Sequence, residues 1–535
     1  MADHFPGEGG SRRRDHDPRT FPPALRRPSL PPRQATGSAA WCGDMNVPLI
    51  RIRAANDKPL NPQGAFVLLW MTAARRTRWN FGLDHAISLA EELGRPLVIL
   101  EAIRSDYPYA SDRFHAFILQ GMADNARRLA GRRVTYHAYV EPQRSAGHGL
   151  LEALAAHACA VVSDWSPAFF LPRMVAAAAA KVPVRMEKVD SCGLLPLAAT
   201  DAPFPLAHSF RRFLQKNLPP HRRAFPSPDP TANLTLPRLE RLPAGIADRW
   251  PAASNDLLAG SQAVLAGLPI DHKVAPTSSV GGSSAAEAAL ETFLRHGLDR
   301  YDQDRNHPDL NASSGLSPWL HFGHISAHQV VHGVLEKDGW DESRLAKKPN
   351  GSREGWWGLP VASEAFLDQL ITWRELGYVQ SHHAPNSNDY ESLPAWARET
   401  LEKHASDPRE HVYGIDDFDR GRTHDPLWNA AQNELRSSGR MHNYLRMLWG
   451  KKILEGSAHP RDALATMLRL NDRYALDGRD PNSVSGIFWV LGRYDRPWGP
   501  ERPIFGAVRY MTSGNTMRKL RAKRYLARWA QGREG

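Results

Sequence analysis

Two stretches in the C-terminal third of the chain bring together side chains that could hold a polar ring system. In Thr423-His-Asp-Pro-Leu-Trp-Asn, Thr423 can cap a helix that has Pro426 in its first turn and carries Trp428. The second stretch, Gly439-Arg-Met-His-Asn-Tyr-Leu-Arg446, begins another helix, which continues past Trp449. An Arg embedded in an apolar helix pair needs an acidic partner, because a buried unpaired guanidinium is costly.

Carboxylates for that Arg occur in the segment Leu470-Asn-Asp-Arg-Tyr-Ala-Leu-Asp-Gly-Arg-Asp-Pro-Asn482, which also supplies amides that could grip a ring. Helix caps, turns and surface salt bridges explain the same residue types, so both interpretations remain open. Upstream, Ser313-Ser-Gly-Leu-Ser317 places three hydroxyl groups and a glycine before a helix. Such a helix start binds phosphate or serves as an ordinary cap, and the pattern does not decide between them.

Aromatic and positively charged residues gather in the second half of the chain. Many of the sixteen tryptophans lie there, and Trp373-Arg-Glu and the run from Trp489 to Trp498 place Trp beside Arg. Tryptophan usually fills a core, but next to Arg in a basic domain it can stack on nucleic-acid bases. From Leu491 onward, eleven Lys and Arg residues stand against three Asp and Glu, in a chain of net charge +11. A polyanion such as nucleic acid is a natural partner for this charge, and a solvated tail is the alternative.

The first half of the chain alternates strand and helix patterns. We predict strands over residues 66–70, 96–100, 134–140 and 160–163, and helices over 84–93, 114–129 and 150–158. This alternation predicts a parallel sheet with helices on both faces, in a Rossmann-like α/β domain over residues 46–200.

The rest of the chain divides into three further segments. Residues 1–45, rich in Pro, Arg, Gly and Asp, are predicted to be a disordered basic tail. Residues 201–284, rich in Pro and loop formers, are predicted to be an inter-domain linker. Residues 285–535 are predicted to be an all-α domain with helices over 285–298, 326–336, 364–380, 393–404, 426–437, 440–454 and 460–470.

Composition excludes several classes of protein. With 535 residues, 42% hydrophobic and 23% charged, the chain has ordinary globular usage. Its three cysteines, Cys42, Cys159 and Cys192, are odd in number and far apart, so we predict neither a disulfide framework nor a metal site. This usage indicates a reducing, cytoplasmic compartment. No apolar run approaches the ~20 residues of a membrane helix, so no membrane contact is expected, and no P-loop motif is present.

Four motifs together resemble one family. Leu316-Ser-Pro-Trp-Leu-His-Phe-Gly323, the stretch beginning at Thr423, Met441-His-Asn-Tyr-Leu-Arg-Met447 and the Leu470–Asn482 segment are similar to motifs of the DNA photolyase/cryptochrome family. The forms His-Asp-Pro-Leu-Trp-Asn and Asp-Gly-Arg-Asp-Pro-Asn resemble class II cyclobutane pyrimidine dimer photolyases in particular. The resemblance extends from about residue 64 to about residue 520, and it is looser in the N-terminal half.

The resemblance implies that the helical domain binds FAD in a folded shape. It places the FAD diphosphate at Tyr301, Ser313, Ser314, Leu316 and Ser317. It further implies a salt bridge between Arg446 and Asp477 beside the flavin ring, Asn471 near flavin N5, and Asn443 and Trp428 close to the flavin. The N-terminal domain of the family can hold an antenna chromophore, often of the 8-hydroxy-5-deazaflavin type, and no motif here decides whether it is present.

The implied activity is that of a deoxyribodipyrimidine photo-lyase, a carbon–carbon lyase. Light-excited reduced FAD passes an electron to a pyrimidine dimer that is flipped out of double-stranded DNA, and the cyclobutane ring splits. By resemblance, Trp373 and Trp489 form the walls of the dimer pocket, and Arg496, Trp498 and Arg509 contact the opened duplex. The protein is expected to act as a monomer.

The resemblance also implies which residues carry electrons to the flavin during its photoreduction. In class II members it follows a tryptophan chain, to which Trp449 and then Trp428 correspond, with Tyr413 near that route.

Two positions depart from the family pattern. Gln369 replaces the Glu that hydrogen-bonds the dimer, and an amide cannot carry a proton for it, so we predict weaker or slower repair. Gly456 stands where the outer tryptophan of the chain is expected, which predicts slow photoreduction, or an exit of the electron path through Tyr413 or another tryptophan. Both departures keep open the alternative of a cryptochrome-like photoreceptor with little or no repair activity. A DNA-binding protein whose flavin is structural is a second alternative.

Overall fold

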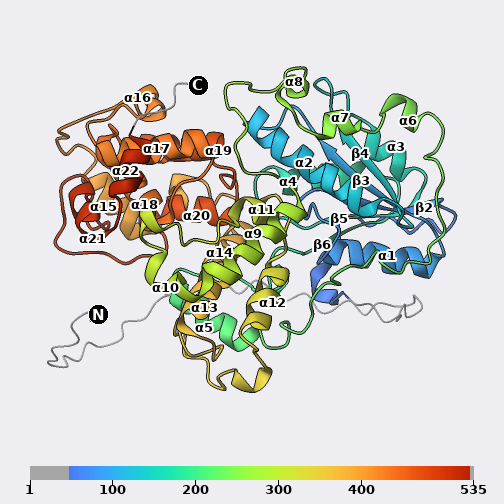
Figure 1. Cartoon of the computed structure of the whole chain (residues 1–535), viewed down its shortest axis with the longest axis horizontal. Coiled ribbons are helices and arrows are strands. Elements are labelled where there is room, and N and C mark those ends of the chain that lie inside the picture. The colour runs from blue at the N-terminus through green and yellow to red at the C-terminus, as the bar shows by residue number, and fades with distance from the viewer. Residues whose placement is uncertain (1–46, 531–535) are drawn as a thin grey trace, which may run out of the picture. The chain divides into compact units, whose positions relative to one another are not determined.

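The computed structural model describes residues 47–530. The predicted tail over residues 1–45 and Cys42 lie outside the described residues. Figure 1 shows the central sheet, in blue to teal, beside a helical part that runs from green to red along the chain. Among residues 47–530, no helix is both long and apolar enough to cross a membrane.

The N-terminal half contains a six-stranded sheet in the order β1-β6-β5-β2-β3-β4. Its strands are β1 (Ile52–Ala54), β2 (Phe66–Met71), β3 (Leu97–Ile103), β4 (Thr135–Val140), β5 (Ala158–Asp164) and β6 (Met186–Val189). All neighbours pair in parallel except β1 and β6, which are antiparallel. The parallel sheet is thus confirmed. Sequence patterns missed β1 and β6, which are only three and four residues long.

Helices cover both faces of this sheet, as predicted. They are α1 (Phe81–Leu93), α2 (Asp112–Leu129), α3 (Leu150–Ala155) and α4 (Leu171–Lys181), the last of which was not predicted. Alternate residues of β2 enter two different cores: Leu68 packs with residues of α3 and α4, whereas Leu69 packs with residues of α1. Because both faces are covered, β2 is apolar throughout.

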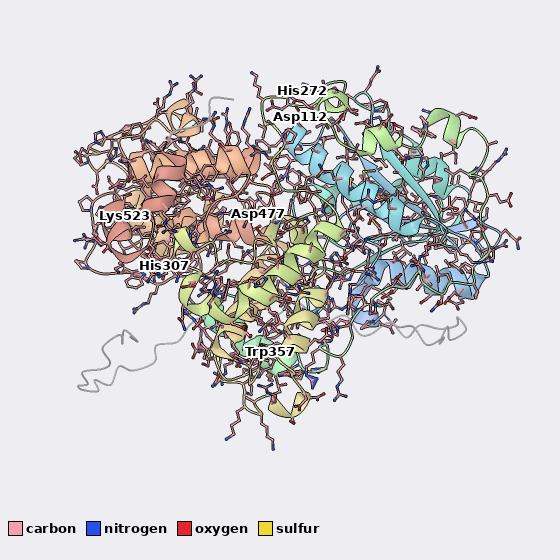
Figure 2. The ribbon with its side chains drawn as sticks, viewed as in Figure 1. Asp112, His272, His307, Trp357, Asp477 and Lys523 are labelled. Atoms are coloured by element: carbon pink, nitrogen blue, oxygen red, sulfur yellow. The ribbon has the colours of Figure 1, made fainter. Side chains whose placement is uncertain are left out.

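The segment over residues 201–284 contains helices of its own. They are α5 (Ala207–Asn217), α6 (Ile246–Arg249), α7 (Asn255–Leu258) and α8 (Gln262–Leu265). Phe210 and Leu214 of α5 are buried in the same core as Phe366, far along the chain. His272 Nδ1 lies within hydrogen-bond distance, 2.8 Å, of Asp112 Oδ1 at the start of α2 (Figure 2). The segment therefore packs on both halves, and the domain boundaries themselves stay a prediction.

The helical half contains every helix predicted there and several more. Its helices are α9 (Ser283–His296), α10 (Tyr301–Asp304), α11 (Ser317–His321), α12 (Ala327–Lys337), α13 (Val361–Leu367), α14 (Arg374–His383), α15 (Ala395–Lys403), α16 (Ile415–Arg420), α17 (Pro426–Ser438), α18 (Asn443–Gly456), α19 (Pro460–Tyr474), α20 (Pro481–Val490), α21 (Ser513–Lys519) and α22 (Lys523–Trp529). A π-helical segment, Asp368–Trp373, joins α13 to α14. The predicted cap of α17 is wrong, because Asp425 and not Thr423 accepts the N–H groups of Leu427 and Trp428.

Buried hydrogen bonds connect the N-terminal half of the chain to the helical half. Arg113 of α2 donates to the carbonyl oxygens of Tyr474 (2.7 Å) and Arg436 (2.6 Å) in the helical half. Glu375 of α14 accepts N–H groups from Leu194 and Leu195 at 2.7 and 3.1 Å, just beyond β6. Burial raises the pKa of Glu375 to about 7. The start of α14 is therefore held against the sheet.

Candidate functional site

A polar network joins three helices in the helical half. Arg446 of α18 donates to Asp477 Oδ1 and to Ser483 Oγ, both at 3.1 Å. Ser483 of α20 donates to Asn471 Oδ1 at 3.2 Å, and Asn471 of α19 donates to the carbonyl oxygen of Gly478 at 2.6 Å. The structure therefore brings together the predicted Arg446, Asp477 and Asn471. It adds Ser483, which the sequence analysis did not single out.

The Arg446–Asp477 pair is a stable ion pair at the edge of the core. Burial alone would raise the pKa of Asp477, but the Arg446 guanidinium and the Ser317 hydroxyl hold it below its usual value. Asn443 lies one turn before Arg446 on α18, so both side chains lie on one helix face, and Asn443 is exposed. Ser317, Asn443 and the ion pair thus offer hydroxyl, amide and charged groups to one polar ligand.

The predicted phosphate-binding loop lies ahead of α11. Gly315 has a φ of +68°, which a side chain would strain, and a Cβ there would lie 2.7 Å from Arg440 Nη2. Among the described residues, no ion pair or hydrogen bond satisfies the Arg440 guanidinium. Ser313 is exposed and Ser314 is half-buried. The loop therefore places the unpaired Arg440 guanidinium near the hydroxyl groups of Ser313 and Ser314, a combination of donors that suits phosphate oxygens.

The other two predicted diphosphate residues lie deeper. Leu316 is 1% exposed and belongs to the apolar core, so only its backbone is left to contact a ligand. Tyr301 packs edge-on against Phe293 and Phe366, with ring centroids 5.8 and 5.3 Å apart. Burial raises its pKa. Sequence reasoning missed Arg440, although it lies within the Gly439–Arg446 stretch that attracted attention.

Trp449 and Trp428, the predicted electron-transfer tryptophans, are buried and begin a row of aromatic side chains that reaches Tyr413 near the surface. Trp449 and Trp428 are 2% and 1% exposed. Trp428 Nε1 donates to the Trp449 carbonyl oxygen at 2.9 Å, and Trp449 Nε1 donates to Gln432 Oε1 at 2.9 Å. The Trp428 ring meets Phe418 edge-on at 5.3 Å, and Phe418 meets Tyr413 in the same way at 5.6 Å. One hydrogen bond and two aromatic contacts therefore connect Trp449 to Tyr413 through Trp428 and Phe418.

A cavity of about 490 Å³ adjoins the outer end of this row. Trp428, Phe418, Tyr413, His424 and Gly456 all line it. A Cβ on Gly456 would lie 3.0 Å from Tyr413 and 3.3 Å from Phe418, so these two rings stand where a larger residue would extend.

Trp373 and Trp489, the predicted walls of a dimer pocket, face each other. Their rings stack at 4.6 Å with an interplanar angle of 21°. Gly377 permits this approach of α14 to α20, since a Cβ there would lie 2.7 Å from the carbonyl oxygen of Pro481. A base inserted between two rings needs roughly 7 Å, twice an aromatic contact distance, so the rings must separate to admit one.

Gln369 and Trp373 both belong to the π-helical segment that joins α13 to α14. Such segments are rare and occur frequently at functional sites. The wider turn nearly aligns residues four apart, so Gln369 and Trp373 lie on one face of the helix. Both side chains are half-buried.

The residues predicted to contact DNA cluster after α20. The Arg509 and Arg496 guanidinium carbons lie 4.3 and 5.0 Å from the Trp498 ring centroid. Asp495 accepts the Trp498 Nε1–H at 3.1 Å and lies 3.5 Å from Arg509 Nε. The ring is therefore held in place by three charged neighbours, at the chain segment with the largest positive excess.

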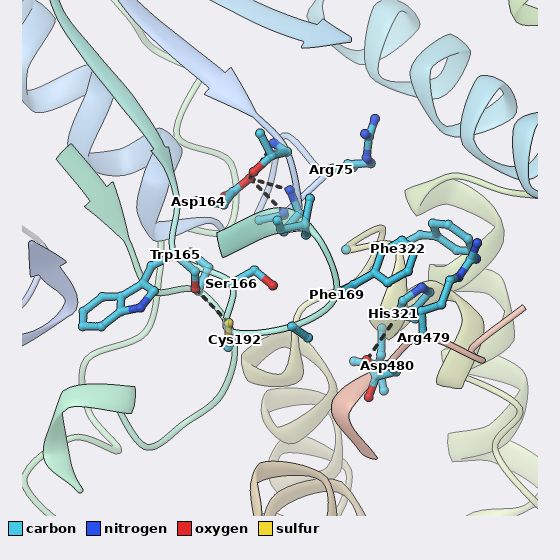
Figure 3. A pocket seen from close by; sticks show the side chains of 18 of the residues that line it. Arg75, Asp164, Trp165, Ser166, Phe169, Cys192, His321, Phe322, Arg479 and Asp480 are labelled. Atoms are coloured by element: carbon cyan, nitrogen blue, oxygen red, sulfur yellow. Dashed lines mark hydrogen bonds and ion pairs between the residues drawn. The ribbon is translucent and has the colours of Figure 1, made fainter. Parts of the chain in front are cut away.

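A second cavity of about 190 Å³ opens at the carboxyl ends of the parallel strands (Figure 3). Asp164 accepts the N–H groups of Thr72, Ala73 and Ala74 at 2.7–3.1 Å and holds the loop after β2 along its wall. Arg479 also lines it, with its guanidinium carbon 3.6 Å from the Phe114 ring centroid.

This Arg479 is 4% exposed, and its Nε and Nη2 have no hydrogen-bond partner among the described residues. Burial lowers its pKa. A buried guanidinium with unused N–H donors in a cavity wall favours a ligand that carries acceptor or anionic groups. The crevice beyond the carboxyl ends of the strands is also where open α/β sheets bind ligands.

Comparisons with known proteins find relatives over most of the chain. The chain is 33% identical over 479 residues to the "Deoxyribodipyrimidine photo-lyase" of Methanothermobacter thermautotrophicus, covering 89% of this chain and 97% of that protein. It is 32% identical to the protein of the same name from Oryza sativa subsp. japonica, covering 93% of each. The crystal structure of a bacterial class III photolyase from Agrobacterium tumefaciens superposes with a TM-score of 0.62 over 87% of this chain, at 17% identity, which shows a shared fold. No protein-family model matches the chain.

Proposed function

Because the chain belongs to the DNA photolyase/cryptochrome family, we propose that it repairs cyclobutane pyrimidine dimers in DNA with light, as a class II deoxyribodipyrimidine photo-lyase. The class II assignment rests on the His-Asp-Pro-Leu-Trp-Asn and Asp-Gly-Arg-Asp-Pro-Asn motifs. The class III structural neighbour shares the fold at only 17% identity and carries no argument about class.

The donor set of the helical half fits FAD. The Ser313–Ser317 loop with the unpaired Arg440 would hold the diphosphate, and the Arg446–Asp477 pair with Asn443 and Asn471 would border the ring. When bound in its reduced form, FAD supplies the light-driven electron. The chain's own residues bind and orient it, and the Arg446 guanidinium offers a fixed positive charge where negative charge develops.

One observation carries the proposal: α20 bears a residue of the polar network and a residue of the aromatic pair. Ser483 bonds Arg446 and Asn471 at one end of the helix, and Trp489 stacks on Trp373 at the other. Six residues separate Ser483 from Trp489, a rise of roughly 9 Å along the helix axis. A flavin ring at the network and a flipped-out dimer at the tryptophans would therefore be close neighbours.

The DNA would be positioned by the surface next to that helix. Arg496 and Arg509 would neutralise phosphates, and Trp498 between them would stack on an unpaired base. The lesion would reach its site as a dimer flipped from the duplex, and a damaged base pair lowers the cost of that step. Gln369, on the face of Trp373, would hydrogen-bond the dimer without transferring a proton to it. We propose that a monomer performs these steps.

The second cavity would hold an antenna chromophore of the 8-hydroxy-5-deazaflavin type. Arg479, whose Nε and Nη2 have no hydrogen-bond partner among the described residues, suits an acidic ring hydroxyl in its anionic form, and Phe169 and Phe322 add apolar wall. In the helical half, Trp449, Trp428 and Tyr413 would return electrons to oxidised flavin along their line of contacts.

A single assay tests the proposed activity. The purified, flavin-loaded protein is reduced, mixed with an oligonucleotide that contains a thymine dimer, and illuminated with blue light. Recovery of absorbance at about 260 nm, where intact thymines absorb, is expected in the light and not in the dark. Tight binding to the damaged oligonucleotide with no recovery would contradict the repair activity and would favour the binding-only alternative.

A cryptochrome-like photoreceptor is the second candidate. Gln369 and the closed Trp373–Trp489 pair favour it, because a photoreceptor needs neither a dimer-protonating group nor an open lesion pocket. Light-driven reduction of the flavin together with weak, lesion-independent DNA binding would identify this function.

A further inference from the structure

The row of aromatic side chains from Trp449 through Trp428 and Phe418 ends at Tyr413. Its buried tryptophans and its outer tyrosine differ in whether the oxidised side chain can transfer a proton to a neighbouring base. Trp449 and Trp428 donate their indole N–H groups to an amide oxygen and a backbone carbonyl oxygen, neither of which is a base at neutral pH. An oxidised tryptophan there keeps its positive charge in a buried position, which is costly. A stable end to the electron path therefore needs a residue that can lose a proton as well as an electron.

Tyr413 is that residue, and His424 is the base beside it. The Tyr413 hydroxyl lies 2.7 Å from His424 Nδ1, and it also accepts the backbone N–H of His424 at 2.9 Å. In the tautomer that leaves Nδ1 unprotonated, the phenol donates its own proton to Nδ1 while its oxygen accepts that N–H. The distance lies within the range required of a general base. His424 is exposed and lines the 490 Å³ cavity, so a proton received there can pass on to solvent.

We propose that His424 accepts the phenol proton when Tyr413 is oxidised, so that the electron path ends in a neutral tyrosyl radical at the protein surface. This inference rests on the proposed function. One electron leaves Tyr413 for the oxidised indole of Trp428, which becomes neutral again, and the proton moves to Nδ1, which gives an imidazolium. When bound in its oxidised form, FAD would supply the primary oxidant on illumination. The Tyr413–His424 pair thus serves in place of the tryptophan that is missing at Gly456.

The decisive variant is His424→Asn, because an Asn Oδ1 takes the position of Nδ1 and accepts the same hydrogen bond but cannot take the proton. The flavin-loaded protein is excited with a laser flash, and the tyrosyl radical is followed by transient absorption and electron paramagnetic resonance. We expect the radical to form about 10²-fold more slowly in His424→Asn, the usual contribution of a general base, while the Trp428 radical lives longer. The thermal unfolding midpoint should not change.

Two further variants separate proton transfer from structure. In His424→Ala, added imidazole can enter the adjoining cavity and should restore the rate. His411→Ala is the matched control, since the His411 ring stacks on His424 at 4.0 Å but makes no hydrogen bond to Tyr413 among the described residues. It should behave as the wild type. A tyrosyl radical that forms at the wild-type rate in His424→Asn, or an imidazole-insensitive His424→Ala, would overturn the proposal.

An oxidant outside the protein makes the test independent of the flavin. Flash-generated tris(bipyridine)ruthenium(III) oxidises exposed tyrosines directly, and the tyrosyl yield of Tyr413, defined by its loss in Tyr413→Phe, should fall in His424→Asn. If illumination of the wild type oxidises no tryptophan, the proposed electron path fails, whereas the ruthenium measurement still decides the role of His424.

Discussion

Loss of the Asp477 charge should reveal how strongly the ion pair with Arg446 holds the helical half together. The two side chains are 18% and 13% exposed, so the pair is closer to a buried than to a surface ion pair. Surface pairs contribute about 0–1 kcal/mol, and breaking a buried pair costs about 3–5 kcal/mol. For Asp477→Asn we therefore expect a loss of about 2–4 kcal/mol in the free energy of unfolding, and a coupling energy with Arg446→Gln of about 2 kcal/mol.

The assay is a double-mutant cycle by urea unfolding, read from tryptophan fluorescence, with equal denaturant slopes required of all four proteins. The exposed pair of Glu291 and Arg295, 60% and 67% accessible, is the matched control and should give about 0.3–0.5 kcal/mol. Because pairing lowers the pKa of Asp477, its contribution is present above the unfolded-state value of about 3.9 and is lost as the pH falls through the lowered value. A coupling energy no larger than that of the control pair would refute the reasoning.

Three further predictions concern other positions. Gln369→Glu should raise the quantum yield of dimer repair several-fold, because a carboxyl group can pass a proton to the dimer. An unchanged yield under blue light would show that the Gln369 amide does not limit repair. Gly377→Ala should cost about 1–3 kcal/mol in urea unfolding, since its Cβ would lie 2.7 Å from the Pro481 carbonyl oxygen, whereas Gly486→Ala, with open space around it, should cost nothing. Burial lowers the pKa of Lys451 to about 7, so the unfolded chain binds an extra proton between that pH and about 10.4, and stability gains up to about 1.4 kcal/mol per pH unit there. Lys451→Met should remove this slope between pH 7 and 9, and an equal slope in both proteins would contradict it.

Much of the fold was predictable because it depends on local patterns. Buried apolar runs predicted four strands of the sheet. Helical periodicity predicted seven helical segments over residues 285–470, and the structure contains a helix in each of them. The pattern failed where segments are short or dominated by turn formers. β6 has four residues, and α20 begins with Pro481-Asn-Ser and contains Gly486.

The candidate site divides in the same way. The resemblance of the motifs to those of the photolyase/cryptochrome family predicted the Arg446–Asp477 pair and the Trp449–Trp428 chain, and the structure places these residues in contact. The position of the unpaired Arg440 guanidinium beside Gly315 was not predictable, because the local sequence does not indicate which distant residue a long side chain contacts.

Sequence by itself determined the family, the alternation of elements and the side-chain chemistry, because these follow from residue type and from spacing along the chain. Tertiary structure alone decided that Trp373 stacks on Trp489 and that Tyr413 meets His424. Both contacts depend on how closely separate segments approach, and that distance is set by packing between them, such as Gly377 against Pro481, which no local pattern encodes.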